Sequence, residues 1–427
     1  MAENTMALAA DLVVTGASRL VTLATGRIDG AAGALGVIER GALAARDGRV
    51  IWCGPEDALT GAVDVRAARA IDARGHAVIP GFVDSHTHFV FAGDRAVEFQ
   101  LRHSGVSYEE LARQGRGILS TVRATRAASA NELRDSAAAR LASFAAHGTT
   151  TVEGKTGYGL DTRSEDICLS VMADVGREAG LPTVVPTFLG AHTLPPEYRD
   201  GSADRARYVD LVCDEMLPAF AGRARFCDVF CERTAFSVDE TRRILTRAAE
   251  LGYLLKLHAN QLGPTGGARL AAELGAVSAD HLDFASDDEL EALRVAGVVG
   301  TLLPGCSFSL SVAYPSARKL LDMGLRVALA TDFNPGTSYC ENMQMMIALA
   351  VSAMGMTLEE ALEAATLGGA AALRMEHEIG SLEPGKRCDL AILRTTDERE
   401  FAYHFGVNLV ERTLVRGQEA RHDDAAV

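Results

Sequence analysis

The chain has 427 residues, of which 48% are hydrophobic and 23% are charged, and its formal net charge is −15. This composition is ordinary for a globular protein, and the acidic charge argues against nucleic acid or an anionic membrane as the main partner. Residues 1–14 contain acidic side chains and no basic ones, unlike a signal peptide, and no apolar run approaches the length of a membrane span. The eight cysteines form no CxxC pair, so we expect reduced, mostly buried thiols in a cytoplasmic protein.

Residues 1–79 are predicted to form short strands and tight turns rather than helices. Leu43–Arg46 and Arg49–Trp52 flank Asp47-Gly48, a pair of residues that is typical of a two-residue β-hairpin turn. We expect this segment to be the N-terminal part of a small β-domain.

Residues 80–379 alternate short apolar segments with amphipathic helices. Capping boxes that begin at Ser237, Ser286 and Thr357 mark the starts of three of these helices. Eight units of one strand and one helix predict a TIM barrel, whose chemistry lies at the carboxyl ends of the strands. The eight expected strands are Gly81–His86, Thr149–Glu153, Thr183–Leu189, Cys227–Cys231, Leu254–His258, Val277–His281, Val298–Leu303 and Arg326–Thr331.

Residues 380–427 return to a strand-like pattern, with expected strands at Cys388–Leu393 and Leu409–Arg416. We expect this segment to complete the β-domain that residues 1–79 begin. The predicted fold class is therefore α/β, with a TIM (β/α)8 barrel and a small β-sandwich domain built from both chain ends.

Histidines gather at the predicted strand ends. In Asp84-Ser85-His86-Thr87-His88 the two histidines are two residues apart, so their side chains leave a strand on the same side. An HxH pair alone is weak, but His258, His281 and Asp332 fall at the ends of later strands. A catalytic divalent ion takes three or four nitrogen or oxygen ligands. The predicted ligands of one such ion are His86, His88, His258 and Asp332.

The expected chemistry is hydrolysis, because a bound divalent ion lowers the pKa of water and polarises a carbonyl. Asp332 is expected both to bind the metal and to take the proton of the water. His281 is expected to be an acid/base partner beside the ligands; the alternative is a structural histidine bonded to Asp280 or to a backbone carbonyl. A second ion bridged by Glu232, which follows the fourth strand, is the rival arrangement. Three imidazoles and a carboxylate suit either zinc or iron.

Several segments resemble the amidohydrolase superfamily of barrel metallohydrolases: Val78–His88, Ala279–His281, Ala330–Asp332 and Gly380–Lys386. Longer matches resemble one family within it, the imidazolonepropionases. These are Phe91–Arg95, Lys155–Gly159, Thr187–His192, His258–Leu262 and Thr331–Gly336. The resemblance implies hydrolysis of the cyclic amide 4-imidazolone-5-propanoate to N-formimidoyl-L-glutamate in histidine breakdown. It also implies one Zn2+ or iron ion per chain and a homodimer.

The same resemblance suggests which residues contact the substrate. Arg95 offers a planar fork for the propanoate carboxylate; without the family match it would be interpreted as a surface arginine paired with Asp94 or Glu98. Tyr158 lies between two glycines and is expected to contact the ring or its carboxylate, the alternative being a tyrosine that packs the loop. His192 is expected to polarise the ring carbonyl or stabilise the oxyanion. Further substrate contacts are expected from Gln261, Asn334, Gly336 and Thr337.

Gln261 separates the competing functions. It occupies the place where related metal deaminases carry a glutamate that shuttles protons, and an amide cannot transfer protons. This argues against a deaminase, although another ring hydrolase or deaminase of the superfamily remains the main rival. A non-catalytic barrel is disfavoured because such a protein should have lost metal ligands, and every expected ligand is present here.

Overall fold

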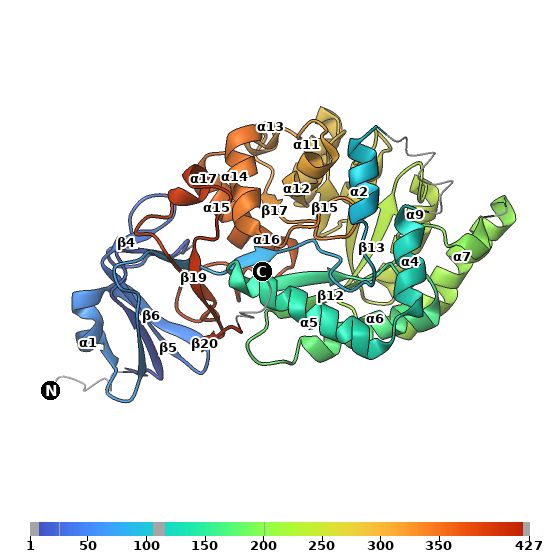
Figure 1. The fold of residues 1–427 in the computed structure, drawn as a ribbon. Helices are drawn as coiled ribbons and strands as arrows, with labels where there is room; N and C mark the ends of the chain where they lie inside the picture. Colours follow the sequence, from blue (N-terminus) through green and yellow to red (C-terminus); the bar gives the residue numbers. More distant parts are fainter. Residues whose placement is uncertain (1–7, 25, 106–115, 200, 422–427) are drawn as a thin grey trace.

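A closed barrel of eight parallel strands forms the centre of the molecule (Figure 1). The computed structural model describes residues 8–24, 26–105, 116–199 and 201–421. The strands follow one another around the barrel in chain order, and a bridge between Thr87 and Phe333 joins the segments that follow the first and the last strand. The predicted TIM barrel is confirmed, with strand ends shifted by at most two residues. The strands are β10 Phe82–Asp84, β11 Thr149–Lys155, β12 Thr183–Ala191, β13 Phe226–Cys231, β14 Leu254–Ala259, β15 Ser278–His281, β16 Val299–Leu302 and β17 Val327–Leu329.

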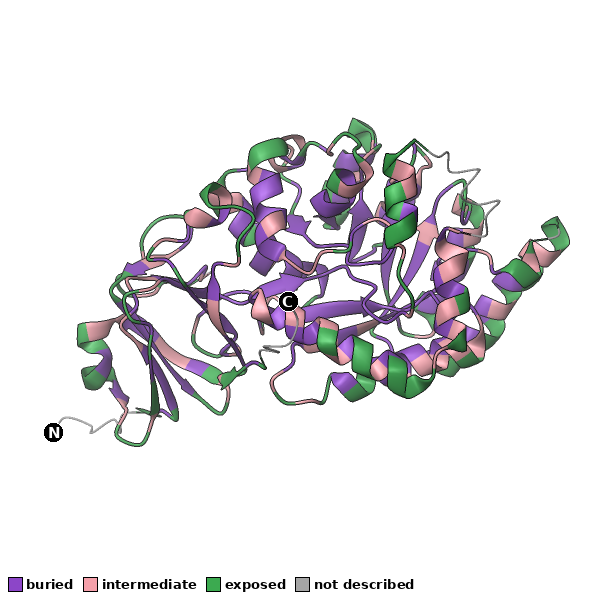
Figure 2. Cartoon of the chain, viewed as in Figure 1, coloured by how far each residue is buried: buried purple, intermediate pink, exposed green. Residues whose placement is uncertain are grey.

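Helices surround the barrel and keep their polar faces toward solvent (Figure 2). The capping boxes predicted at Ser237, Ser286 and Thr357 are present, and Ser129 with Glu132 forms a fourth that the sequence analysis did not single out. The longer helices are α2 Ala96–His103, α4 Ile118–Ala127, α5 Ala130–Ala146, α6 Thr162–Val175, α7 Ser202–Leu211, α9 Val238–Glu250, α10 Gly267–Glu273, α11 Asp287–Ala296, α12 Pro304–Leu310, α13 Ala317–Asp322, α14 Met343–Ala353 and α15 Leu358–Glu363. Shorter turns are η1 Glu56–Ala58, α1 Leu59–Ala62, η2 Pro196–Tyr198, η3 Val212–Met216, α8 Leu217–Phe220, η4 Ala364–Gly368, α16 Gly369–Ala372 and α17 Glu400–Tyr403.

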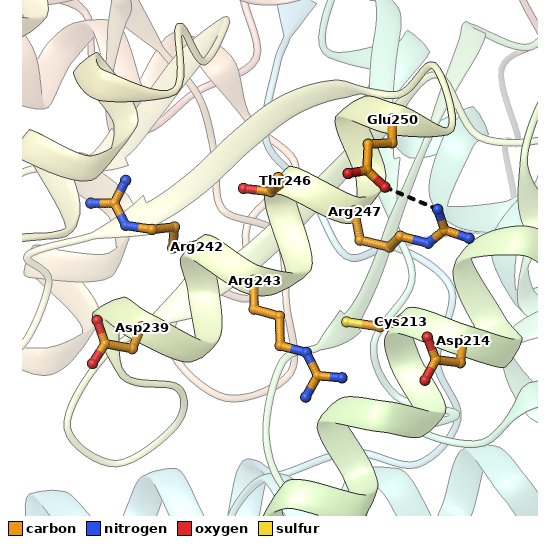
Figure 3. Close-up of a pocket in the computed structure, with 8 residues that line it drawn as sticks. All are labelled: Cys213, Asp214, Asp239, Arg242, Arg243, Thr246, Arg247 and Glu250. Atoms are coloured by element: carbon orange, nitrogen blue, oxygen red, sulfur yellow. Dashed lines mark hydrogen bonds and ion pairs between the residues drawn. The ribbon is translucent and has the colours of Figure 1, made fainter.

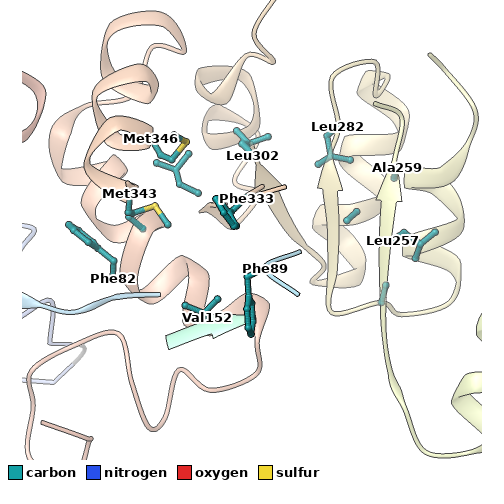
Figure 4. Packing of buried hydrophobic residues seen from close by; sticks show 14 of the residues in the cluster. Phe82, Phe89, Val152, Leu257, Ala259, Leu282, Leu302, Phe333, Met343 and Met346 are labelled. Atoms are coloured by element: carbon teal, nitrogen blue, oxygen red, sulfur yellow. The ribbon is translucent and has the colours of Figure 1, made fainter. Parts of the chain in front are cut away.

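The barrel strands are apolar toward the helices and partly polar toward the barrel axis. In β14, Leu255 and Leu257 belong to the core between the strands and the helices, while Lys256 and His258 are buried on the alternate side. Side chains alternate along a strand with a period of two, which produces this division. Figure 4 shows part of the outer core, where Phe82, Phe89, Val152, Phe333 and Met343 pack without exposure to solvent.

Both chain ends build two small sheets beside the barrel (Figure 1). The six-stranded sheet has the order β20-β19-β18-β9-β3-β4 and the four-stranded sheet the order β6-β5-β2-β8, while β1 pairs with β7. Leu12, Leu43, Val78, Leu390 and Leu414 share the core of these sheets. The strands are β1 Leu8–Ala9, β2 Leu12–Thr15, β3 Arg19–Val21, β4 Val37–Glu39, β5 Gly41–Arg46, β6 Arg49–Pro55, β7 Val63–Asp64, β8 Arg69–Asp72, β9 Val78–Pro80, β18 Leu390–Leu393, β19 Val410–Val415 and β20 Gln418–Glu419.

The predicted hairpin joins β5 and β6. Asp47 and Gly48 have φ angles of 51° and 73°, as a turn between two twisted antiparallel strands requires. All eight cysteines are free thiols and seven of them are buried, as expected. Within the described ranges, every helix is too short or too polar to cross a membrane.

Candidate active site

Three imidazoles and one carboxylate meet at the carboxyl ends of β10, β14 and β17. The Nε2 atoms of His88 and His258 are 3.4 Å apart. Oδ1 of Asp332 lies 3.5 Å from Nε2 of His86 and 3.6 Å from Nε2 of His88. Metal–ligand bonds of about 2.1 Å at tetrahedral angles separate ligand atoms by roughly 3.4 Å. His86, His88 and Asp332 therefore form a group that could hold one divalent ion, and His258 lies beside His88 at the same spacing.

The protonation of these groups also suits a cation. Burial lowers the pKa of His86, His88 and His258 well below the usual value of histidine, so all three imidazoles are neutral and have a nitrogen lone pair to offer. Nε2 of His86 is buried and has no hydrogen-bond partner among the described residues. Burial raises the pKa of the Asp332 carboxyl to about 8, and a neighbouring cation would favour its ionised form.

Two carboxylates orient the histidine ligands from behind. Nδ1–H of His86 donates to Asp280 at 2.6 Å, and Nδ1 of His258 lies 3.0 Å from a carboxylate oxygen of Asp228. Because each Nδ1 faces a carboxylate, the Nε2 atoms are left as the metal-binding nitrogens. The sequence analysis assigned no role to Asp228 and considered Asp280 only as a partner of His281.

Buried lysines balance these carboxylates inside the barrel. Lys155 Nζ lies 2.7 Å from Asp228, 3.1 Å from Glu153 and 3.5 Å from Asp280. Lys256 Nζ donates to Glu153 at 2.8 Å, and all five side chains are fully buried. The sequence analysis missed this network. Its signal was a set of charged residues at inward positions of otherwise apolar strands.

His281 lies beside the ligands, but it is not paired with Asp280, as the alternative of a structural histidine proposed. Asp280 is turned to His86, and Nδ1 of His281 lies 3.9 Å from Asp283. Burial lowers the pKa of His281 to about 4. Cys306, on α12, lies close to His281 and Asp332. The possible ligand atoms of these three residues lie within 4.8 Å of one another. The sequence analysis treated Cys306 as an ordinary buried thiol.

The rival two-metal arrangement finds less support. One carboxylate oxygen of Glu232 accepts the backbone N–H of Leu262 at 2.9 Å, so this side chain holds the loop that follows β14. Among the described residues, no group of closely spaced metal-binding side chains includes Glu232.

Arg95, Tyr158 and His192 lie around the ligands as the sequence analysis expected. The ring of His192 stacks on that of His88 with centroids 5.1 Å apart, and the Tyr158 ring lies 5.3 Å from that of His192. Arg95 is mostly buried, yet it also makes the ion pair with Glu98 that the alternative reading expected. Its Nε donates to Glu98 at 3.0 Å and its Nη2 donates to the second carboxylate oxygen.

The hydrogen bond of His192 corrects one expected role. Nδ1 of His192 lies 3.1 Å from the carbonyl oxygen of Gly157. A carbonyl only accepts, so Nδ1 carries the proton. Burial lowers the pKa of His192 to about 4, and Nε2 of the neutral ring is then an acceptor. His192 is thus suited to accept a substrate N–H, and not to donate to a carbonyl or oxyanion as the sequence suggested.

The loop after β17 is held by Asn334. Its Oδ1 accepts the backbone N–H groups of Gly336 and Thr337, both at 2.8 Å, and its Nδ2 donates to the backbone oxygen of Asp332 at 2.6 Å. The hydroxyl of Thr337 lies 3.4 Å from Oδ2 of Asp332. Asn334 therefore shapes the loop rather than presenting a free amide.

Gln261 donates from Nε2 to the sulfur of Cys306 at 3.5 Å.

A second depression lies on the outer surface between α9 and η3 (Figure 3). Its arginines are already paired: Arg242 with Glu273, Arg243 with Asp210 and Arg247 with Glu250. It is not at the strand ends where barrel chemistry occurs. The histidine cluster is therefore the candidate active site.

Comparisons with known proteins agree with this assignment. The sequence model of the amidohydrolase family matches residues 77–420. An imidazolonepropionase from Symbiobacterium thermophilum is 51% identical over 418 residues, 96% of each chain, and one from Herpetosiphon aurantiacus is 44% identical over 425 residues, 97% of this chain and 98% of that protein. A solved adenosine deaminase from Xanthomonas campestris with bound zinc has a TM-score of 0.71 at 19% identity, over 97% of this chain and 94% of its own. At that identity it shares the fold alone.

Proposed function

The chain belongs to the amidohydrolase family and, within it, to the imidazolonepropionases, and we propose that its histidine cluster hydrolyses the ring amide of 4-imidazolone-5-propanoate. The product is N-formimidoyl-L-glutamate, and the reaction is a step of histidine degradation. The observation that carries the proposal is a cluster of buried ligand atoms beside Tyr158: Asp332 lies 3.5 Å from His86 and 3.6 Å from His88, and His258 lies 3.4 Å from His88.

We assign His86, His88, His258 and Asp332 to one zinc or iron ion, because this ligand set suits both. When bound, the ion supplies Lewis-acid polarisation of the ring carbonyl and of a water molecule. Asp280 and Asp228 keep the ligand histidines in the tautomer that binds metal through Nε2.

The proton transfers are assigned to Asp332 and His281. Water adds to the ring carbonyl carbon, and Asp332 takes its proton. The ring C–N bond then breaks, and the leaving nitrogen takes a proton from Asp332 or from His281. Without the ion, burial raises the pKa of Asp332 to about 8; the bound cation would lower it, so that the carboxylate can first take a proton and then give it up. Gln261 transfers no proton, and it orients the ring through its amide.

The substrate is held by groups around the ligands. Arg95 and Tyr158 are assigned to the propanoate carboxylate. His192 accepts a hydrogen bond from a ring N–H through Nε2. Gly336 and Thr337 form the wall beside Asp332, and a Cβ at Gly336 would lie 2.2 Å from Nη1 of Arg95, so a side chain there would displace this guanidinium.

The test is turnover of freshly generated 4-imidazolone-5-propanoate, produced by a urocanase step and followed by its ultraviolet absorbance. We expect the metal-loaded protein to consume it and to release N-formimidoyl-L-glutamate, and a chelated sample to be inactive. The Arg95→Gln variant should mainly raise KM. Metal-loaded protein that leaves the substrate unchanged would refute the assigned substrate while leaving the metal site in place.

A further inference from the structure

The charge of Arg95 is already neutralised within the protein. Glu98 is 4% exposed, and its carboxylate accepts from Nε and Nη2 of Arg95 and from the backbone N–H of Gly117 at 2.8 Å. The two N–H groups of Nη1 and the second N–H of Nη2 remain, and Nη1 lies against Gly336. This ion pair by itself offers a substrate carboxylate no net positive charge.

A second arginine, Arg102, lies near Arg95 and Gly336, in the part of the site that we call the substrate corner. It is on the last turn of α2, and its Nη1 donates to the backbone oxygen of Gly336 at 3.2 Å. Gly336 therefore lies between the two guanidinium groups. The electrostatic neighbours of Arg102 are Glu98, Arg95 and the active-site thiol of Cys306.

Two further donor atoms of Arg102, Nε and Nη2, have no acceptor among the described residues. Both atoms are buried. The guanidinium also lies 5.6 Å from the ring centre of Phe99, which satisfies no N–H group. Buried donors without partners cost free energy, so a group that binds here and accepts from them is favoured.

We propose that Arg102 is a second carboxylate-binding residue, which supplies the uncompensated positive charge that holds the propanoate of the substrate. Two guanidinium groups and one glutamate leave one positive charge in this corner, and one carboxylate neutralises it. Nε and Nη2 of Arg102 form one edge of the planar fork that pairs with both carboxylate oxygens. This inference rests on the proposed function, because it names the residue that selects that substrate by its charge.

The experiment compares two substrates on metal-loaded protein: 4-imidazolone-5-propanoate and the analogue whose propanoate is a neutral propanamide. In the Arg102→Gln variant we expect kcat/KM for the propanoate to fall roughly 10- to 100-fold, the range for losing a charged hydrogen bond. The propanamide should be converted about as well as by the wild-type protein, since no carboxylate is lost. Arg102→Lys keeps the charge but not the fork, and should lie between.

Arg225 provides a matched control. Its Nη2 also donates to a backbone oxygen, that of Arg374, at 3.2 Å, but it precedes β13 at the opposite end of the barrel. Arg225→Gln should leave both substrates unaffected.

Equal losses on both substrates in Arg102→Gln would show that Arg102 only holds the Gly336 loop, and would overturn the inference while the proposed function stands. Wild-type protein that is inactive on the propanoate would overturn the proposed function and this inference with it.

Discussion

We expect Asp280, a member of the buried charge network, to strengthen metal binding. Asp280 is fully buried and accepts from Nδ1 of His86 and from the hydroxyl of Ser278, both at 2.6 Å. Its carboxylate stays ionised: burial acts to raise its pKa, but Lys256 and Lys155 outweigh burial and the pKa is lowered. Asp280→Asn keeps the shape of the side chain and removes this charge.

Asp280→Asn should weaken metal binding in two ways. A neutral amide makes Nε2 of His86 a poorer ligand, and such changes behind a ligand cost about 10- to 100-fold in metal affinity, or about 1.4 to 2.8 kcal/mol. The charge beneath the ligands also rises, because Glu153 and Asp228 alone then balance the two lysines. Lys155 keeps Asp228 at 2.7 Å and Glu153 at 3.1 Å, so we expect the fold to persist.

The assay is zinc titration of chelator-treated protein in competition with a fluorescent chelator. Asp389 supplies the control, since it is 4% exposed and accepts the backbone N–H of Arg416 at 2.6 Å in the terminal sheets. Asp389→Asn should bind zinc as the wild type does. If folded Asp280→Asn also bound zinc with wild-type affinity, the assignment of Asp280 as the residue that orients His86 would be wrong.

Three further outcomes are expected. Asp332→Ala removes a ligand and the proton acceptor, so turnover in the ultraviolet assay should fall below detection while the circular dichroism spectrum is retained; measurable turnover would contradict both roles. Lys256→Met leaves Glu153 buried with one lysine fewer, and should lower the free energy of unfolding in urea by about 3 to 5 kcal/mol; a loss under about 1 kcal/mol would be that of a weak pair. Burial lowers the pKa of His192 and His281 from 6.5 to about 4, so in that interval the unfolded chain binds more protons than the folded one. The contribution of these two groups to the free energy of unfolding should therefore decrease as pH falls from 6.5 toward 4 and be constant above 6.5. Because Asp332, with its raised pKa, contributes in the opposite direction, the check is NMR titration of the individual imidazoles; ring pKa values near 6.5 in the folded protein would contradict buried neutral rings.

The barrel and the ligand set follow from local patterns. Alternating apolar strands and capped helices predict the barrel, and parallel strands bring their carboxyl ends to one face. The HxH spacing of His86 and His88 then places both rings on one side of a strand, and His258 and Asp332 at later strand ends fall on the same face. The hairpin at Asp47-Gly48 is equally local, since only two residues define it.

What surrounds the ligands depends on contacts across the barrel. The partner of each charged side chain inside the barrel depends on how far the strands are shifted along the barrel axis relative to one another. No short stretch of sequence contains that information. Asp280 therefore turns to His86 on β10 rather than to His281 beside it, and Lys155 meets Asp228 from another strand.

The substrate corner shows the same division. The sequence identified Arg95 by its motif and offered Glu98, three residues away, as an alternative partner; the structure shows that ion pair. The packing of α2 on the loop after β17 joins Arg102 to Gly336 and leaves its Nε and Nη2 without a partner among the residues that the structure describes. The sequence by itself determined the fold and pointed to the four predicted metal ligands, because strands and helices follow from local patterns and a parallel barrel brings its strand ends to one face. The tertiary structure decided charge balance, tautomers and substrate contacts, because these depend on which side chains meet across elements distant in sequence.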